Sequence, residues 1–243
     1  MPLNRSRADY RALLAEADAL YPGVRVGRPV TARTYFPLIA GMRVLRGRWR
    51  VRTQGAEHVA PGPAILIGNH VHNMDPVMVV ISEWWRCSAF TKLEAFTTRG
   101  GVFFRFMGQI PLRRGDVTST DWSMRMAQYT LSRGGKIAIY PEGTRSPDPT
   151  QLHKLHKRML IPLLQDNPDI PVHVVGIRYE HPGGARRIRV EIRVSERLTL
   201  DPTAMTADEL VTIVRNSMLE LGGQTYVDRY AQDVKAERRA SAS

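Results

Sequence analysis

Apolar positions recur along the chain at two spacings, and these predict strands and helices in turn. Short apolar runs of strand length stand at 64–68, 88–91, 109–112, 136–140 and 172–177, and polar and apolar residues alternate at 49–53 and 188–194. Helical spacing or length marks 8–20, 30–46, 76–85, 119–133, 154–164 and 207–221. Because strand and helix follow one another repeatedly, we predict an α/β fold with a mixed, largely parallel sheet flanked by helices.

The two ends of the chain differ from this pattern. Residues 1–48 are interpreted as an N-terminal helical pair at a membrane surface, because the apolar side chains of 30–46 are flanked by arginines that suit anionic headgroups. The alternative is a helix that covers the core and leaves a basic edge in water. We predict the main body at 49–232, and a flexible tail at 233–243 because those residues are charged or small. The whole chain is expected to form a single domain.

Composition limits the partners that the protein can have. The chain has 35 Lys and Arg against 23 Asp and Glu, a formal charge of +12, so we expect an anionic partner: phosphate, a membrane surface, an acidic carrier protein or nucleic acid. Its one cysteine, Cys87, excludes an internal disulfide and a cysteine-rich zinc site. No run reaches the ~18 apolar residues that would span a bilayer, so the sequence predicts a protein in solution or on a membrane surface.

The apolar run at 64–68 leads directly to His70, and Asp75 follows five positions later. A histidine can take a proton from a hydroxyl near neutral pH, and a nearby carboxylate can fix its tautomer and stabilise its charge. Asp75 also precedes Pro76 and an apolar helix, so it is expected to cap that helix and, from there, to orient His70. His72 leaves another reading open, a metal-dependent hydrolase that uses His70, His72 and Asp75 as ligands.

A second polar loop follows the apolar run at 136–140, with the sequence Pro-Glu-Gly-Thr-Arg at 141–145. In a parallel sheet, the loops at the carboxyl ends of the strands converge on a ligand crevice. Gly143 lets the backbone approach a ligand closely, Arg145 offers a fork for phosphate or carboxylate oxygens, and Glu142 can hold a hydroxyl or a cation. A plain surface turn is the alternative for this loop taken alone.

Taken together, these residues resemble the glycerolipid acyltransferase family, of the lysophosphatidic acid acyltransferase type. Its first signature, Asn-His-x4-Asp, stands at 69–75, and its third, Pro-Glu-Gly-Thr-Arg, at 141–145. The second signature is similar to residues 108–114, which aligns Arg114 with the family's phosphate-binding arginine, and the fourth is similar to 170–177. The resemblance covers roughly 50–180. The chain departs from it at 153–159, where a Lys-x-Gly turn is replaced by a segment without glycine.

The resemblance implies transfer of an acyl group from acyl-CoA or acyl-carrier protein to the hydroxyl of a lysophospholipid. The first acceptor it implies is 1-acylglycerol-3-phosphate, which would give phosphatidic acid. His70 would be the general base and Asp75 its orienting partner. Substrate binding is implied for Arg114, Glu142, Gly143, Thr144 and Arg145, with the two arginines on the phosphate.

The same resemblance implies neither a metal nor a cofactor, since the substrate supplies the nucleophile. It implies a cytoplasmic protein on the inner face of the cell membrane, with no nucleic acid partner. Three alternatives stay open from the residues: another lysolipid acceptor, the metal-dependent hydrolase, and a basic nucleic-acid or membrane-binding module without catalysis.

Overall fold

The structure is a computed structural model that describes residues 7–26, 32–44, 49–180 and 188–241, so parts of the predicted N-terminal segment lie outside it. Its strands are β1 (Trp49–Gln54), β2 (Ala64–Gly68), β3 (Cys87–Lys92), β4 (Ile110–Leu112), β5 (Lys136–Ile139), β6 (Gln151–His153), β7 (Val172–Glu180), β8 (Ile188–Val194) and β9 (Thr225–Val227). Its helices are α1 (Arg7–Leu20), α2 (Ala32–Val44), α3 (Asp75–Glu83), α4 (Leu93–Thr97), α5 (Gly101–Phe106), α6 (Val117–Ser132), α7 (Lys157–Gln165), α8 (Ala207–Gly222) and α9 (Ala231–Ala240), with a 3-10 turn at Ala56–His58.

Seven strands form one sheet in the order β1-β8-β7-β2-β5-β3-β4. Strands β7, β2, β5, β3 and β4 run parallel to one another, whereas β8 runs antiparallel to β7 and pairs in parallel with β1. The predicted mixed, largely parallel sheet flanked by helices is therefore confirmed. All five residues of β2 are buried, because a central parallel strand is covered on both faces.

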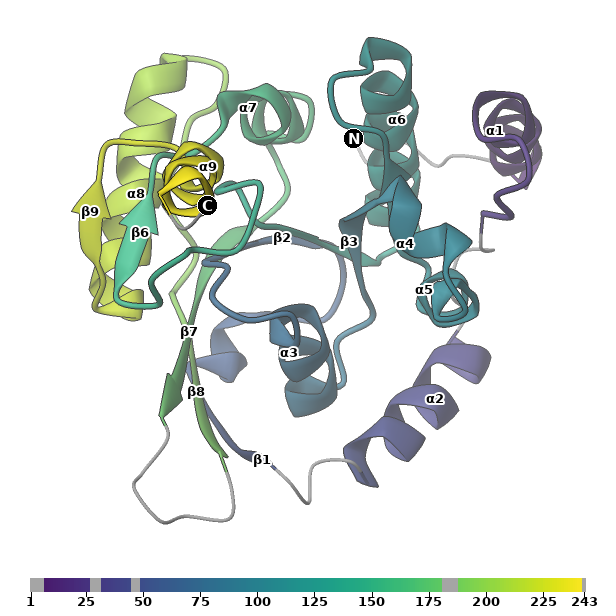
Figure 1. The fold of residues 1–243 in the computed structure, drawn as a ribbon. Coiled ribbons are helices and arrows are strands. Elements are labelled where there is room, and N and C mark those ends of the chain that lie inside the picture. The colour runs from purple at the N-terminus through teal and green to yellow at the C-terminus, as the bar shows by residue number, and fades with distance from the viewer. Residues whose placement is uncertain (1–6, 27–31, 45–48, 181–187, 242–243) are drawn as a thin grey trace.

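The side chains of the central strands alternate between two hydrophobic cores, one on each face of the sheet. Ile65 and Ile67 of β2 pack in the core shared with α1, α6, α7 and α8, whereas Leu66 packs in the core shared with α2 and α3. Figure 1 shows these helices on opposite sides of the strands. Because these strands are parallel, the loops that follow β2, β4 and β5 all lie at the carboxyl ends of the strands, at the same end of the sheet.

The first two helices belong to different layers and do not form a paired unit. Helix α1 packs on α6, and α2 packs on α3, and the two are well separated in Figure 1. In α2, Tyr35 and Ile39 are fully buried, whereas Phe36 and Val44 are exposed. One face of helix α2 therefore packs in the core, and the membrane-surface interpretation of residues 1–48 stays a prediction. In the part of the chain that the structure describes, every helix is too short or too polar to cross a membrane.

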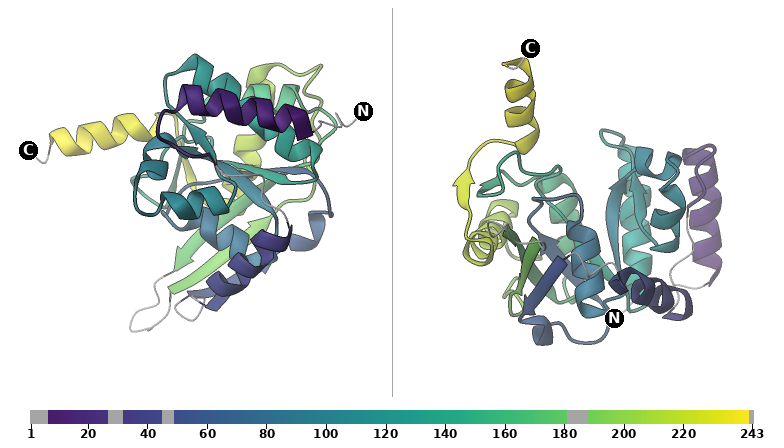
Figure 2. Two further views of the ribbon diagram at one scale, coloured as in Figure 1. Left: turned by 90° about the vertical axis from the view of Figure 1, so that its right-hand side faces the viewer. Right: turned by 60° about the horizontal axis from the view of Figure 1, so that its bottom comes forward.

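The C-terminal residues form a helix where the sequence was expected to give a flexible tail. Helix α9 extends away from the body of the molecule in both views of Figure 2. Its residues are mostly strong helix formers, and Asp233 in its first turn and Arg238 and Arg239 in its last turn complement the helix dipole. Charge and small size alone do not distinguish a flexible tail from a helix built of such residues.

Candidate active site

The main chain of His70 is fixed on both sides by the loop that follows β5. The His70 N–H donates to Glu142 Oε1 at 2.9 Å, and the His70 carbonyl accepts from the Ser146 N–H at 2.6 Å. The preceding residue, Asn69, is buried and exchanges hydrogen bonds of 2.7 and 3.0 Å with the main chain of Ile177 on β7. The neighbouring strands therefore hold the backbone at the end of β2, while the imidazole stays 21% exposed.

Asp75 orients the imidazole of His70. The Nδ1–H of His70 donates to Asp75 Oδ2 at 2.8 Å, and the same oxygen accepts from the N–H groups of Val71 and His72, also at 2.8 Å. An ionised carboxylate can only accept, so Nδ1 carries the proton. The unprotonated Nε2 is thereby left available to take a proton from a substrate.

The expectation that Asp75 caps helix α3 is wrong. The helix begins at Asp75 itself, its N-cap residue is Met74, and no side chain caps it. The Asp75 carboxylate instead turns back to the segment that precedes the helix. Its place in the first turn still favours negative charge, because the N-terminal end of a helix carries a partial positive charge.

Two tyrosines that the sequence did not single out surround this pair. The Tyr140 ring lies 4.9 Å from the His70 ring between centroids. Burial, and next the negative charge of Asp75, raise the pKa of Tyr179 on β7, which keeps its phenol protonated beside the carboxylate. Both residues stand near the carboxyl ends of strands, where ligand-contacting residues are expected, but neither belongs to a short motif.

His72 is engaged in packing near the pair. Its ring lies 4.9 Å from the Tyr179 ring and 5.8 Å from the Trp49 ring, and its Nδ1 accepts from the Met74 N–H at 3.2 Å. Among the described residues, no three His, Cys, Asp or Glu side chains are grouped as metal ligands would be. The side-chain geometry therefore gives no support to a metal-dependent hydrolase that uses His72 as a ligand.

The Glu142 side chain binds main-chain N–H groups of the site, whereas the sequence predicted that it would contact the substrate. Its side chain is fully buried, and its two oxygens accept from the N–H groups of His70 and His153, at 2.9 and 3.1 Å. Burial raises its pKa to about 7, although the two N–H groups act in the opposite direction. Glu142 therefore ties the end of β2 to β6 and positions the main chain of His70.

This burial predicts a pH dependence of stability. Because the folded-state pKa of Glu142, about 7, lies above its ordinary 4.5, the folded protein holds the proton more tightly than the unfolded chain. The stability that this group contributes is complete below pH 4.5 and is lost as the pH rises through about 7, by up to roughly 3 kcal/mol. Urea unfolding from pH 5 to 8 should show this loss in the native protein and not in Glu142→Gln. The exposed Glu57→Gln is the control and should follow the native profile; identical profiles for Glu142→Gln and the native protein would contradict the assignment.

The other predicted binding residues gather around the same loop. Arg114, which follows β4, donates from Nη2 to the Gly143 carbonyl, and Thr144 Oγ1 accepts from Lys235 at 3.3 Å. Arg145 is exposed. Arg113 is directed elsewhere, since its guanidinium contacts Asp116 and the Tyr21 ring. Of the two adjacent arginines, only Arg114 therefore joins the Pro-Glu-Gly-Thr-Arg loop.

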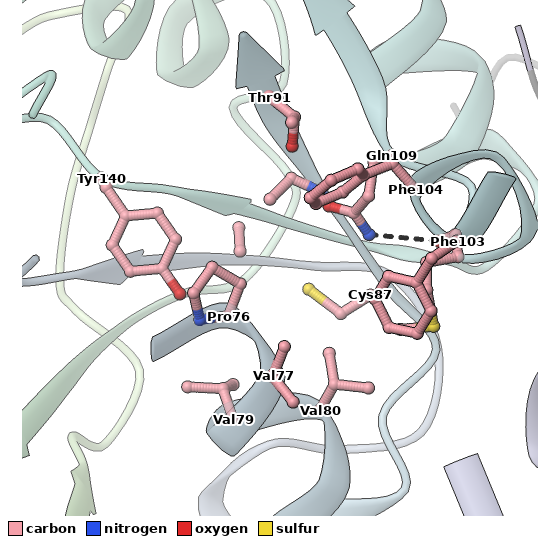
Figure 3. Close-up of a pocket in the computed structure, with 13 residues that line it drawn as sticks. Pro76, Val77, Val79, Val80, Cys87, Thr91, Phe103, Phe104, Gln109 and Tyr140 are labelled. Carbon is pink, nitrogen blue, oxygen red and sulfur yellow. Dashed lines mark hydrogen bonds between the residues drawn. The ribbon is translucent and has the colours of Figure 1, made fainter. Parts of the chain in front are cut away.

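Figure 3 shows an apolar pocket, one wall of which is formed by the valines of α3. The pocket lies next to the His70–Asp75 pair, because its lining includes Tyr140, whose ring lies 4.9 Å from that of His70, and Pro76, which follows Asp75. Phe103 and Phe104 of α5 lie across from Tyr140. The pocket is lined by Pro76, Val77, Val79, Val80, Cys87, Ala89, Thr91, Phe103, Phe104, Met107, Gln109, Ala138 and Tyr140. Burial raises the pKa of the Cys87 thiol to about 12, so this side chain acts as a small apolar group.

Comparison with known proteins agrees with this geometry. The sequence profile of the acyltransferase family matches residues 50–178, just over half of the chain. The chain belongs to the acyltransferase family. No curated protein matches it significantly. Among solved structures, it is similar to the 1-acyl-sn-glycerophosphate acyltransferase PlsC from Thermotoga maritima, with a TM-score of 0.60 at 22% identity over 77% of this chain and 76% of that one.

The acyltransferase match contains His70, Asp75, Arg114 and the loop at 141–145. It ends at 178, so β8, α8, β9 and α9 lie beyond it. It includes 153–159, where the sequence departs from the family pattern, and the structure places His153 in β6, paired with β9. In this acyltransferase, the departure from the family pattern therefore occurs where the C-terminal segment packs on the candidate site.

Proposed function

We propose that this acyltransferase moves a fatty acyl group from acyl-CoA or acyl-carrier protein to the free hydroxyl of 1-acylglycerol-3-phosphate, giving phosphatidic acid. The observation that carries the proposal is the position of an oriented histidine. The His70 ring lies against Tyr140, which lines the apolar pocket. The His70 main chain is hydrogen-bonded to Glu142, which belongs to the cationic loop. The pocket would bind an apolar chain, His70 would take the proton of the reacting hydroxyl, and the cationic loop would bind a phosphate.

The proposed reaction needs only the two substrates and this pair of side chains. His70 Nε2 takes the proton of the acceptor hydroxyl while the hydroxyl oxygen attacks the thioester carbonyl. The tetrahedral intermediate then expels the thiolate, which receives the proton back from His70. Asp75, held by three donors, stabilises the imidazolium between the two steps. We propose no metal and no cofactor, because the substrates supply both the nucleophile and the leaving group.

The acceptor's phosphate is assigned to Arg114 and Arg145. Both arginines lie in loops that follow the carboxyl ends of β4 and β5, and both are exposed. Arginine suits phosphate because its planar fork matches two phosphate oxygens at once. Gly143 and Thr144 lie between them in the chain and would form the wall of the acceptor site.

We assign the acyl chain to the apolar pocket, which predicts an effect on chain-length preference. Ala89 of β3 is buried and lines the pocket, so Ala89→Leu should shorten the space available to the chain. The rate with long acyl donors is expected to fall about tenfold relative to the rate with short ones. Competition between donors of 8 to 18 carbons, followed by mass spectrometry of the products, measures this ratio. Full activity with the shortest donor shows that the fold is kept, and an unchanged ratio would reject the assignment.

A peripheral position on the inner face of the cell membrane is part of the proposal. The chain carries a charge of +12, and the exposed apolar residues include Phe36, Trp84, Val102 and Phe106. The rings of Phe36 and Trp84 are 6.1 Å apart, and Arg43 lies over Trp84. Helices α2 and α5 lie on the same side of the molecule in Figure 1. Apolar side chains bordered by arginine suit an anionic lipid surface better than nucleic acid.

The proposed function is tested by identifying the product. The purified protein is incubated with a panel of lysophospholipids and with each acyl donor, and the lipids are analysed by mass spectrometry. Phosphatidic acid is the expected product, with 1-acylglycerol-3-phosphate preferred over acceptors whose phosphate carries a headgroup. A preference for another lysolipid would correct the acceptor and keep the reaction. Absence of transfer to every acceptor from both donors would reject the function.

A further inference from the structure

The C-terminal segment is attached to the same loops that hold His70. Strand β9 pairs in parallel with β6, and Gln224 precedes it. The Gln224 side chain accepts from Asn69, the neighbour of His70, at 3.0 Å and donates to the Pro149 carbonyl at 3.0 Å. Figure 1 shows α9, β9 and β6 lying together. The C-terminal segment, which lies outside the family match, therefore contacts the chain at the end of β2, next to His70.

The start of α9 is held against the Pro-Glu-Gly-Thr-Arg loop by stacked rings. Tyr230 stacks on His156 with ring centroids 4.3 Å apart and planes at 6°. His156 in turn lies against Gly143, where an added Cβ would come within 2.8 Å of the imidazole. Further along α9, Arg238 donates to the Pro147 carbonyl at 3.0 Å. These contacts, from Tyr230 at the start of α9 to Arg238 in its last turn, hold the helix against the loop.

This docking brings Lys235 into the candidate acceptor site. Its side chain is partly buried, and Nζ donates to Thr144 Oγ1 at 3.3 Å. Within the described part of the chain, no carboxylate forms an ion pair with it. Burial, followed by the positive charges of Arg145, Arg239 and Lys92, lowers its pKa, while Glu142 opposes the change from its buried position.

Cations gathered in this way repel one another, and partial burial weakens the screening by water. A bound dianion would relieve the repulsion, because each cation would gain an opposite charge. A phosphomonoester presents two negative charges and three terminal oxygens, whereas a phosphodiester headgroup presents one charge. The cluster therefore matches the first class of acceptor better than the second.

We propose that Lys235 binds the phosphate of the acceptor together with Arg114 and Arg145, so that helix α9 supplies a substrate-binding residue from beyond the family match. This assignment rests on the proposed function, because it places Lys235 in the same acceptor site. Lys235 would favour phosphomonoester acceptors through its charge. It takes no part in the proton transfer, which His70 and Asp75 carry out.

Lys235→Gln and Lys235→Arg are the informative variants, and Arg11→Gln on α1 is the control, since it removes one exposed positive charge in another layer. With 1-acylglycerol-3-phosphate, Lys235→Gln should raise KM about 10- to 100-fold, as expected for a lost charged hydrogen bond. The kcat and the KM for the acyl donor should change less than about threefold. Lys235→Arg should recover most of the loss, and Arg11→Gln should remain within about twofold of the native protein.

Calorimetric binding of glycerol 3-phosphate gives a second measurement that does not depend on catalysis. Weaker binding to Lys235→Gln, with native thermal unfolding, supports the assignment even if the native protein transfers no acyl group and the proposed function fails. An unchanged KM together with unchanged glycerol 3-phosphate binding overturns it, whatever the native activity. A fall in kcat, or a loss of thermal stability, that Lys235→Arg does not reverse would show a structural role and would also overturn it.

Discussion

Replacement of His70 by alanine should lower acyl transfer to a lysophospholipid by about 10²- to 10⁴-fold, the range expected for a lost general base. The loss should appear in kcat, because the apolar pocket and the arginine loops remain in place. Stability should change little, since the bonds that fix this position involve the His70 main chain. The Asp75 carboxylate also keeps two of its three donors in this variant. Steady-state kinetics and thermal unfolding of the purified variant measure both quantities.

His72→Ala is the matched control for this experiment. The two histidines are separated by one residue, but the His72 ring packs against Trp49 and Tyr179. Its replacement should therefore cost less than about tenfold in rate. Equal and large losses in both variants would favour a role for His72 in the chemistry, as in the hydrolase alternative. Transfer by His70→Ala at a rate near that of the native protein would reject His70 as the base.

The candidate pair, His70 and Asp75, was predictable from the sequence because both residues follow one strong local pattern. The apolar run at 64–68 forms β2, so the position of His70 at its carboxyl end follows from the strand itself. A parallel sheet then brings the loop after β5 to the same edge. The family resemblance, carried by the same short motifs, is confirmed by the match over 50–178.

The residues that hold this site were less accessible to sequence reasoning. Glu142 was expected to contact substrate, but its two oxygens accept from N–H groups 72 and 11 positions away in the chain. Asn69 similarly joins Ile177 and Gln224, which are 108 and 155 positions away. Such contacts depend on how whole strands pack, and single-sequence patterns report only local periodicity. The same limit explains why the contacts of α9 with the loop at 141–145 were not anticipated.

The main chain of the site is therefore held by many hydrogen bonds, whereas few of its side chains are engaged in them. Glu142, Ser146 and Asn69 fix the main chain around His70 through backbone hydrogen bonds. In the proposed mechanism, the imidazole Nε2 and the cations of the surrounding loops would contact the substrate. Because the backbone is already fixed, little reorganisation would be needed when the proposed acceptor binds, which would lower the barrier to reaction.

Replacing Asp75 should separate the orienting role of this residue from its charge. All three donors meet the same oxygen, Oδ2. An asparagine with its carbonyl in that place keeps the three hydrogen bonds, and its amide group then takes the position of Oδ1, which has no hydrogen-bond partner among the described residues. The tautomer of His70 is preserved in Asp75→Asn, and only the negative charge is lost.

Asp75→Asn should therefore fold normally and lower kcat by about 10²-fold, because the imidazolium loses its counter-charge in a buried setting. Asp75→Ala should be more severe. It leaves the N–H groups of Val71 and His72 without an acceptor, which costs about 1–3 kcal/mol of stability for each, and it frees the imidazole to rotate. Comparison of kcat and urea unfolding in the two variants isolates the electrostatic part. Equal losses of activity in both would show that orientation contributes nothing beyond the charge, and full activity in Asp75→Asn would show that the charge is not needed.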